Sequence, residues 1–304
     1  MKIKKMTKRL MARASTLFLL ALLFADADAG QRSYPADPLS DVEWSTGTSG
    51  VGDIETAFNT ARKNENAELG TTIPMLSLPS QAEWDAMTGD EKALWLINRE
   101  RQDRSVAPLH GIEENVDAVA QDYAGYLAEH DVFGHREDGN SPWDRLSANP
   151  AIGACHDFLE VAENLFIFYS SGPKIPMPVE RAIYGWMYDT RGSGNWGHRH
   201  AILWDAYDDN SGPDGKEGFL GMGLASGPSA EWPHAERVVM NVFDPCETWA
   251  YPKVYNLQHV VEVLNILTGM DASELTVEQD DVDNDGVIGL PEAMYMLGKI
   301  SEMH

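Results

Sequence analysis

The chain has 304 residues and carries 48 acidic against 23 basic side chains, a formal net charge of −25. Such an acidic surface repels polyanions, so binding to nucleic acid or to anionic membranes is excluded as the expected function. The length allows one or two domains after any processing.

Residues 1–29 have the layout of a secretory signal peptide. A basic region is followed by an apolar run over 15–25 (STLFLLALLFA), and Ala27 and Ala29 suit cleavage before Gly30. The apolar run is shorter than the roughly 20 residues that a membrane crossing needs. We therefore expect a secreted or periplasmic protein with no membrane span.

Only two cysteines occur, Cys155 and Cys246. In an exported protein two cysteines usually pair, so a disulfide is expected. Two free, buried thiols are the alternative.

The segment 30–79 reads as a leader and linker. Its first part is rich in Ser, Thr, Gly, Pro and Asp without periodicity, which is typical of disorder. A short polar helix is expected over 53–68, followed by a linker with two prolines.

The main domain is expected over 80–245. A capping box, Thr88 with Glu91, predicts the start of a first helix. Further helices are expected over 114–130 and from Pro178, and strands over 219–224 and 237–243. Helices that come first and strands that come last favour an α+β fold over alternating βαβ units.

Five ordered motifs in this domain resemble the CAP superfamily, which includes the cysteine-rich secretory proteins, antigen 5 and plant pathogenesis-related proteins. The bacterial secreted branch is the more similar. The motifs are Asn98-Arg99-Glu100-Arg101, Phe133-Gly134-His135, Ser141-Pro142-Trp143-Asp144-Arg145-Leu146, Ala162-Glu163-Asn164-Leu165 and Gly197-His198-Arg199-His200-Ala201-Ile202-Leu203.

The resemblance implies a three-layer α-β-α sandwich with a cleft lined by two histidines and two acidic residues. Carried over to this chain, these are His135, Glu163, Asp189 and His198. Asp189 stands where animal members have the longer glutamate. Two of them also have a structural reading: His198 as an imidazole bonded to a carbonyl, and Glu163 as a buried carboxylate bonded to backbone amides. His200 falls on a variable position of its motif and is expected to be an ordinary packed or solvated residue.

Two imidazoles and a carboxylate could hold Zn²⁺ or another divalent metal. The usual hydrolase motifs, H-E-x-x-H and G-x-S-x-G, do not occur. A non-catalytic module that binds a metal or a small-molecule, lipid or peptide ligand is therefore expected, and a metal-dependent hydrolase of peptide or cell-wall material is the alternative.

An acidic loop over 204–218 is either a solvated turn or a further calcium loop, and 170–178 is a Pro/Gly-rich insertion near the cleft.

The segment 246–304 is a separate unit with a calcium-binding motif. DVDNDGVIGLPE, from Asp281 to Glu292, fits the twelve-residue EF-hand loop. The ligands it predicts for Ca²⁺ are the side chains of Asp281, Asp283, Asp285 and Glu292 and the carbonyl of Val287.

An apolar pattern in this unit repeats after 33 residues. Leu257, Val260, Val261, Leu264 and Leu267 recur as Leu290, Ala293, Met294, Leu297 and Ile300. A duplicated calcium loop and helix resembles a dockerin module, although the first copy lacks the loop ligands. The resemblance implies a cohesin-like partner and, as a third functional hypothesis, a subunit docked to a larger extracellular assembly. We expect the apolar stripe of the second helix to pack on the first helix only when calcium is bound.

Overall fold

The computed structural model of the protein describes residues 34–45, 47, 49–153, 160–172, 174–205, 218–244, 257–270, 275, 282 and 286–302. Several expected features lie outside these residues: the signal peptide, the acidic loop from 206 to 217, and the side chains of Cys155, Cys246, Asp281, Asp283 and Asp285.

A four-stranded sheet, counted over the described residues, forms the centre of the main domain, in the order β1-β3-β4-β2. β1 (Gly111–Ile112) runs parallel to β3 (Phe219–Gly227). β3 pairs antiparallel with β4 (His234–Asp244), which pairs antiparallel with β2 (Glu160–Ser170). β2 therefore forms one edge of the described sheet.

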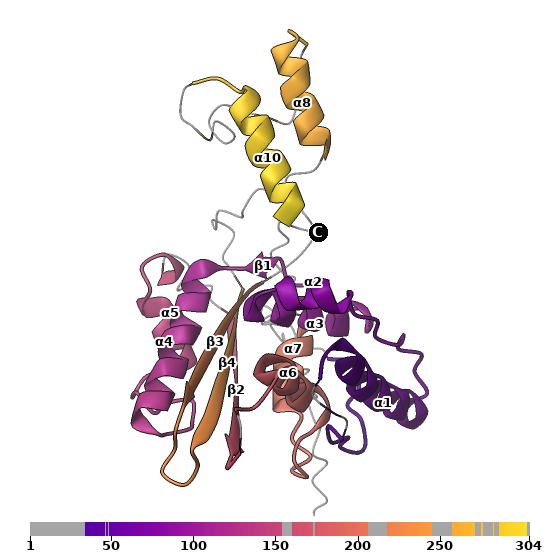
Figure 1. The fold of residues 1–304 in the computed structure, drawn as a ribbon, viewed down its shortest axis with the longest axis vertical. Helices are drawn as coiled ribbons and strands as arrows, with labels where there is room; N and C mark the ends of the chain where they lie inside the picture. Colours follow the sequence, from indigo (N-terminus) through magenta and orange to yellow (C-terminus); the bar gives the residue numbers. More distant parts are fainter. Residues whose placement is uncertain are drawn as a thin grey trace, which may run out of the picture. The chain divides into compact units, whose positions relative to one another are not determined.

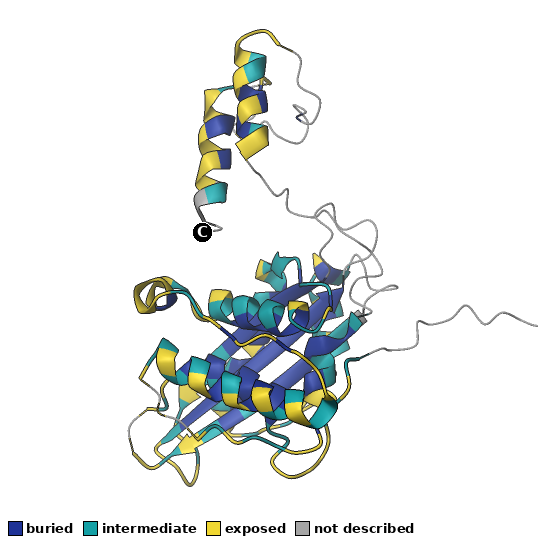
Figure 2. Ribbon diagram, turned by 90° about the vertical axis from the view of Figure 1, so that its right-hand side faces the viewer, coloured by how far each residue is buried: buried dark blue, intermediate teal, exposed yellow. Residues whose placement is uncertain are grey.

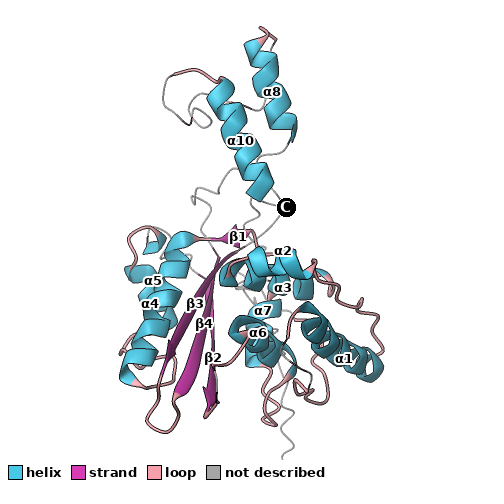
Figure 3. Ribbon diagram, viewed as in Figure 1, coloured by secondary structure: helices cyan, strands magenta, loops and turns pink. Residues whose placement is uncertain are grey.

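Helices cover both faces of the sheet (Figure 1, Figure 3). On one face lie α4 (Glu114–His130) and α5 (Pro142–Ala148). On the other face lie α1 (Val51–Leu69), α2 (Gln81–Ala86), α3 (Gly89–Gln102), α6 (Pro178–Tyr188) and α7 (Gly197–Leu203). The expected α+β class is confirmed. Among the described residues, no helix combines the length and the apolar character that crossing a membrane requires.

Alternation along β3 explains how the helices approach the sheet. A Cβ on Gly221 would lie 2.3 Å from the backbone of Val116, and one on Gly223 would lie 2.1 Å from the backbone of Ala120. These glycines let α4 lie directly on the sheet. Leu220 and Met222 point to the opposite face and join the buried core beneath α3 and α6. β4 and the first half of β3 are accordingly buried on both faces (Figure 2).

The described part of the expected leader and linker, from residue 34 to residue 79, is instead packed into this core. Ile54 and Phe58 of α1 are fully buried, and Leu76 follows them into the same cluster. The Val42 backbone N–H donates to the Tyr188 carbonyl over 2.8 Å. The folded domain thus begins well before residue 80. A mostly polar helix gave little sign of this, because only one narrow stripe of α1 is apolar.

A buried network of ion pairs fixes α1 to its neighbours. Arg62 of α1 contacts Glu100 of α3 at 2.7 Å, and Arg104 contacts Glu65 at 2.6 Å. Arg199 of α7 reaches the same Glu65 at 2.5 Å. These five side chains are at most 2% exposed. Each charge is paired, which a buried charge requires.

The first family-like motif, Asn98 to Arg101, therefore has structural roles. Asn98 exchanges two hydrogen bonds with the backbone of Leu109, at 2.7 and 3.0 Å. Glu100 joins the ion network and accepts from the Tyr188 hydroxyl at 2.6 Å. Arg101 donates to the carbonyls of Ile202 and Trp204 at the end of α7. The motif holds α3 against the loop before β1 and against α7.

The C-terminal unit has its own small core. α8 (Leu257–Leu267) and α10 (Leu290–Glu302) pack together through Val260, Val263, Leu275, Ile288, Ala293 and Met296. The repeated apolar stripe divides between core and surface. Its Val260 and Ala293 positions are buried, but most of its other members are exposed: Leu257, Val261, Leu264, Leu267, Leu290, Met294 and Leu297. The two helices do pack on each other as expected, through the facing members of the stripes, because two helices in contact bury only their facing sides. The dependence of this packing on calcium stays a prediction.

Candidate functional site

The site is built on the edge strand β2, which the sequence did not predict as a strand. Glu163 lies opposite Asn241 of β4 in the sheet register. The Glu163 side chain is only 1% exposed, so its carboxylate has to be satisfied by protein groups.

His135 supplies the first of those groups. Its Nδ1 lies 2.8 Å from Oε1 of Glu163. The His135 side chain is 47% exposed, whereas its partner is buried. A carboxylate in this position accepts a proton-bearing Nδ1, which fixes the ring orientation and leaves Nε2 directed to other partners.

Arg145 of α5 supplies the second group. Its Nη2 lies 2.6 Å from Oε2 of Glu163 and donates to the His135 carbonyl over 3.2 Å. Its Nη1 contacts Asp138 at 2.9 Å and donates to the Asn140 carbonyl over 3.0 Å. Arg145 is therefore bonded both to the buried carboxylate and to the loop that carries His135. Both oxygens of Glu163 are engaged.

Local sequence explains why α5 presents Arg145 here. Ser141 and Asp144 form a capping box, and Pro142 occupies the first turn. On α4, the Tyr123 ring lies flat beneath Arg145, with the guanidinium carbon 3.5 Å from the ring centroid. The Tyr123 hydroxyl donates to the Gly134 carbonyl. Burial raises the pKa of Tyr123, so this hydroxyl stays protonated and keeps donating.

His198, the second residue of α7, approaches the site from the other face of the sheet. Asn164, the neighbour of Glu163 in β2, donates from Nδ2 to the His198 carbonyl over 2.8 Å. His198 itself is exposed to solvent. Desolvation by the surrounding protein nevertheless lowers the pKa of its imidazole, and the charges of His135 and Arg191 lower that pKa further. The imidazole of His198 is therefore neutral at pH 7, the form that binds metals or accepts a hydrogen bond.

The other two residues considered from the sequence have local partners. Asp189 ends α6, and its Oδ1 accepts from the Arg191 backbone N–H over 2.8 Å. His200 bonds Asp37 through Nε2 at 2.8 Å and stacks on Tyr34 at 4.2 Å. The structure thus brings together His135, Glu163 and, at longer range, His198.

Within the part of the chain that the structure describes, no group of three or more His, Cys, Asp or Glu side chains is arranged to hold a metal ion. The donor set explains this. Glu163 is bonded to Arg145 and His135 rather than left free, so two imidazoles are the nitrogen ligands on offer. Glu163 is the carboxylate partner of His135.

One family of known proteins is similar to the main domain. Residues 94–209 match the CAP family, described as the cysteine-rich secretory protein family. The match spans 116 of the 304 residues, from 94 to 209. The match contains all five motifs, from Asn98 to Leu203, and it supports assignment of the domain to the CAP superfamily.

Other comparisons add little. One solved structure, an outer surface protein from Borrelia burgdorferi, is similar with 12% identity and a TM-score of 0.34. The similarity covers 56% of this chain and 97% of that one. No curated protein matches the chain.

Arg145 and Tyr123 are the residues of the main domain that the sequence did not assign to the site. Arg145 lies within the Ser141–Leu146 motif. An arginine in a family-like motif, together with a glutamate expected to be buried, could have indicated an ion pair between Arg145 and Glu163. Tyr123 gave none, because it lies on the periodic buried face of α4 like any core residue.

Proposed function

We propose that the CAP domain is an extracytoplasmic, non-catalytic binding module that uses His135 and His198 to hold a divalent metal of the Zn²⁺ type or a ligand in its place. The observation that carries the proposal is the 2.8 Å contact between His135 Nδ1 and Glu163, with Glu163 fixed in turn by Arg145. Metal-binding histidines commonly have such a carboxylate on their second nitrogen. Family similarity supports the compartment and the binding role.

The engaged state of Glu163 favours binding over hydrolysis. A hydrolase would need a general base near the metal-bound water. Glu163 has both oxygens engaged with Arg145 and His135, so it is not free to take a proton. A metal-dependent hydrolase of peptide or cell-wall material stays the alternative. Release of cleavage products from such a substrate by the metal-loaded protein would establish it.

The test is calorimetric titration of the mature protein with Zn²⁺. His135→Gln and His198→Gln should each weaken binding at least tenfold, and Glu163→Gln should weaken it about 10–100-fold as the loss of an outer partner. Arg145→Lys should give a smaller loss, since lysine keeps the charge but not the paired geometry. His234→Gln, at the start of β4, is the matched control. Equal affinity in wild type and both histidine variants would refute the site.

We also propose that the C-terminal unit binds Ca²⁺. Gly286 has a φ of +87°, the conformation expected at the sharp turn of the loop. Glu292, at position twelve, is 1% exposed and accepts from the backbone N–H of Gly289 at 2.6 Å and of Val282 at 3.3 Å. A buried carboxylate that faces back across the loop supports a cation site there.

Calcium binding is tested on the full mature chain by calorimetry and circular dichroism. A Kd of about 10⁻⁴–10⁻³ M is expected, as for extracellular EF-hand modules. Glu292→Gln should remove the binding heat, and Glu129→Gln, an exposed residue of α4, should not. Binding that is unchanged by Glu292→Gln would place the ion elsewhere.

A second candidate function, docking to a larger assembly, is favoured by the exposed apolar residues of α8 and α10. Leu257 and Leu290 are 65% and 58% exposed, and they occupy equivalent positions of the repeat. Contiguous exposed apolar surface often marks a protein interface. Binding to a purified cohesin-like domain, lost in Leu257→Ser/Leu290→Ser, is the expected result; no binding by wild type would reject this role.

A further inference from the structure

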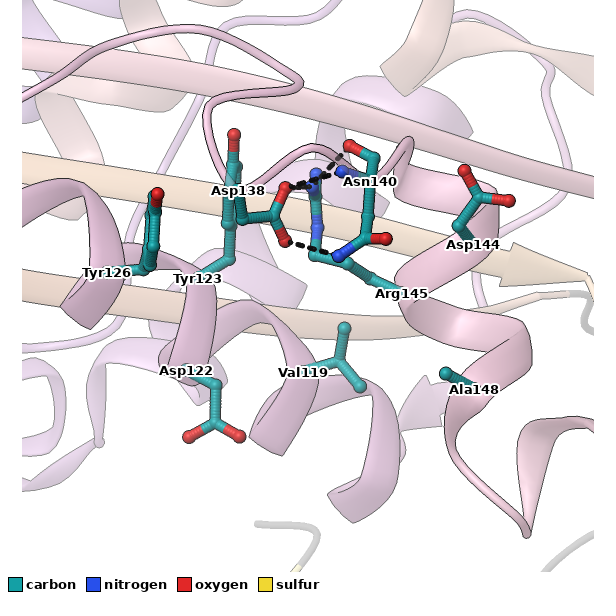
Figure 4. A pocket seen from close by; sticks show the side chains of 9 residues that line it. All are labelled: Val119, Asp122, Tyr123, Tyr126, Asp138, Asn140, Asp144, Arg145 and Ala148. Atoms are coloured by element: carbon teal, nitrogen blue, oxygen red, sulfur yellow. Dashed lines mark hydrogen bonds and ion pairs between the residues drawn. The ribbon is translucent and has the colours of Figure 1, made fainter.

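A pocket of about 360 Å³ lies between α4 and α5, separate from the His135 and His198 imidazoles. Figure 4 shows the nine side chains that line it: Val119, Asp122, Tyr123, Tyr126, Asp138, Asn140, Asp144, Arg145 and Ala148. Its volume falls at the lower end of the range of about 300–1,000 Å³ for small-molecule sites.

Some polar groups of this α4–α5 pocket are already used. Asp138 accepts from Arg145 and from both the backbone and the side-chain nitrogens of Asn140. One oxygen of Asp144 accepts from the backbone and hydroxyl of Ser141. The Tyr126 hydroxyl donates to the Glu137 carbonyl over 2.9 Å.

Other polar groups lack a partner within the described structure. The exposed carboxylate of Asp122 has no hydrogen-bond or ion-pair partner there, and the side-chain carbonyl of Asn140 is also open. Conversely, Arg145 has a buried donor, Nε, without an acceptor. The pocket thus offers open acceptors on Asp122 and Asn140 and the second N–H of the Asn140 amide, whereas Nε of Arg145 is too buried for a ligand to reach.

The apolar part of the lining is fixed in place. Tyr126 stacks on His130 with ring centroids 4.1 Å apart and lies nearly parallel to Tyr123, at 9°. Val119 and Ala148 contribute aliphatic surface near this wall. A ligand that fills the pocket therefore needs an apolar face as well as groups that both donate and accept hydrogen bonds.

From these features we infer that the α4–α5 pocket binds a single neutral sugar ring. Hydroxyl groups donate to Asp122 and to the side-chain carbonyl of Asn140 and accept from the second N–H of the Asn140 amide, so one ligand class uses all the open groups. The C–H face of a pyranose suits an aromatic and aliphatic wall. An anion is disfavoured by three carboxylates against one arginine. A cation would lie close to the positive charge of Arg145.

The experiment is NMR titration of the mature, full-length protein with glucose, N-acetylglucosamine and, as a cationic probe, agmatine. At least one of the two sugars should bind with a Kd on the order of 1 mM, as small neutral ligands do, and should shift resonances of Val119 and Tyr126. Asp122→Asn should weaken binding about threefold or more, and Tyr126→Leu should abolish detectable binding.

Glu129→Gln is the matched control, since it makes the same charge change on an exposed turn of α4 outside the lining. His135→Gln should bind the sugar normally, which separates this pocket from the proposed metal site. Three results would overturn the inference: neither sugar binds, agmatine binds in preference to both, or sugar binding survives Asp122→Asn and Tyr126→Leu unchanged.

Discussion

At the scale of single residues, the site depends on how Glu163 is shared. Arg145 neutralises the buried carboxylate, which would otherwise be costly to desolvate, and the same carboxylate orients His135. Asn164 donates a hydrogen bond to the backbone carbonyl of His198 and so holds this residue in place. The His198 imidazole is therefore positioned without a hydrogen bond to Glu163. The two histidines therefore have different roles: one is oriented by a charge, and the other is kept neutral by its surroundings.

The first prediction concerns the pKa of His198. In NMR titration it should lie below the ordinary value of 6.5, and His135→Asn should raise it only in part, because desolvation is its largest cause. The folded state binds this proton less readily than the unfolded state does. The contribution of His198 to stability is thus complete above pH 6.5 and is lost as pH falls below it. A pKa of His198 at or above 6.5 would contradict this account.

At the scale of elements, the domain relies on polar contacts between helices as much as on its core. Glu100 of α3 pairs with Arg62 of α1 and with Arg104, while Glu65 of α1 pairs with Arg104 and with Arg199 of α7. Burial alone would raise the pKa of Glu100, but the two arginines lower it to about 2. The network connects α1 to the helices that support the site.

The second prediction is that Glu100→Gln lowers the free energy of unfolding by about 3–5 kcal/mol, because it leaves buried arginines without a counter-charge. Since the folded pKa of Glu100 lies below its unfolded value, the stabilisation it provides is present above about pH 4.5 and is lost as pH falls toward 2. Urea unfolding at pH 7 measures the difference. A loss no larger than that of the exposed Glu129→Gln would show that the network adds no stability.

Sequence patterns identified elements with strong local signals. The Thr88 capping box, the apolar face of α4 and the proline at the start of α6 were all predictable. β2 was not, because its residues (EVAENLFIFYS) are neither strictly alternating nor wholly apolar. Proximity of His135 to Glu163 came from family resemblance alone. The roles of Arg145 and Arg62 depend on partners 18 and 38 residues away, which no local pattern contains.

At the scale of the whole molecule, the described chain has a main domain that includes α1 and a C-terminal unit with a separate core. The N-terminal segment contributes the buried Ile54 and Phe58 as well as two members of the ion network. It therefore completes the domain in which the site is built. The acidic charge of the chain disfavours polyanionic partners.

The third prediction follows from this division. Deleting residues 34–70 should cost at least about 5 kcal/mol of stability, from lost apolar burial and from charges left unpaired. Deleting 246–304 should change the Tm of the main domain by only a few degrees. Thermal melts of both truncated proteins provide the test. If the two deletions lower the Tm of the main domain equally, α1 is not an integral part of that domain.

The proposed function requires His135 and His198 to bind one and the same metal ion. Anomalous X-ray diffraction from crystals of the mature protein soaked with Zn²⁺ tests this most directly. We predict an anomalous peak about 2.0–2.1 Å from Nε2 of His135 and from a ring nitrogen of His198, with Glu163 still bonded to Nδ1 of His135. A zinc peak bonded to neither histidine, or to only one of them at saturating Zn²⁺, would contradict the account.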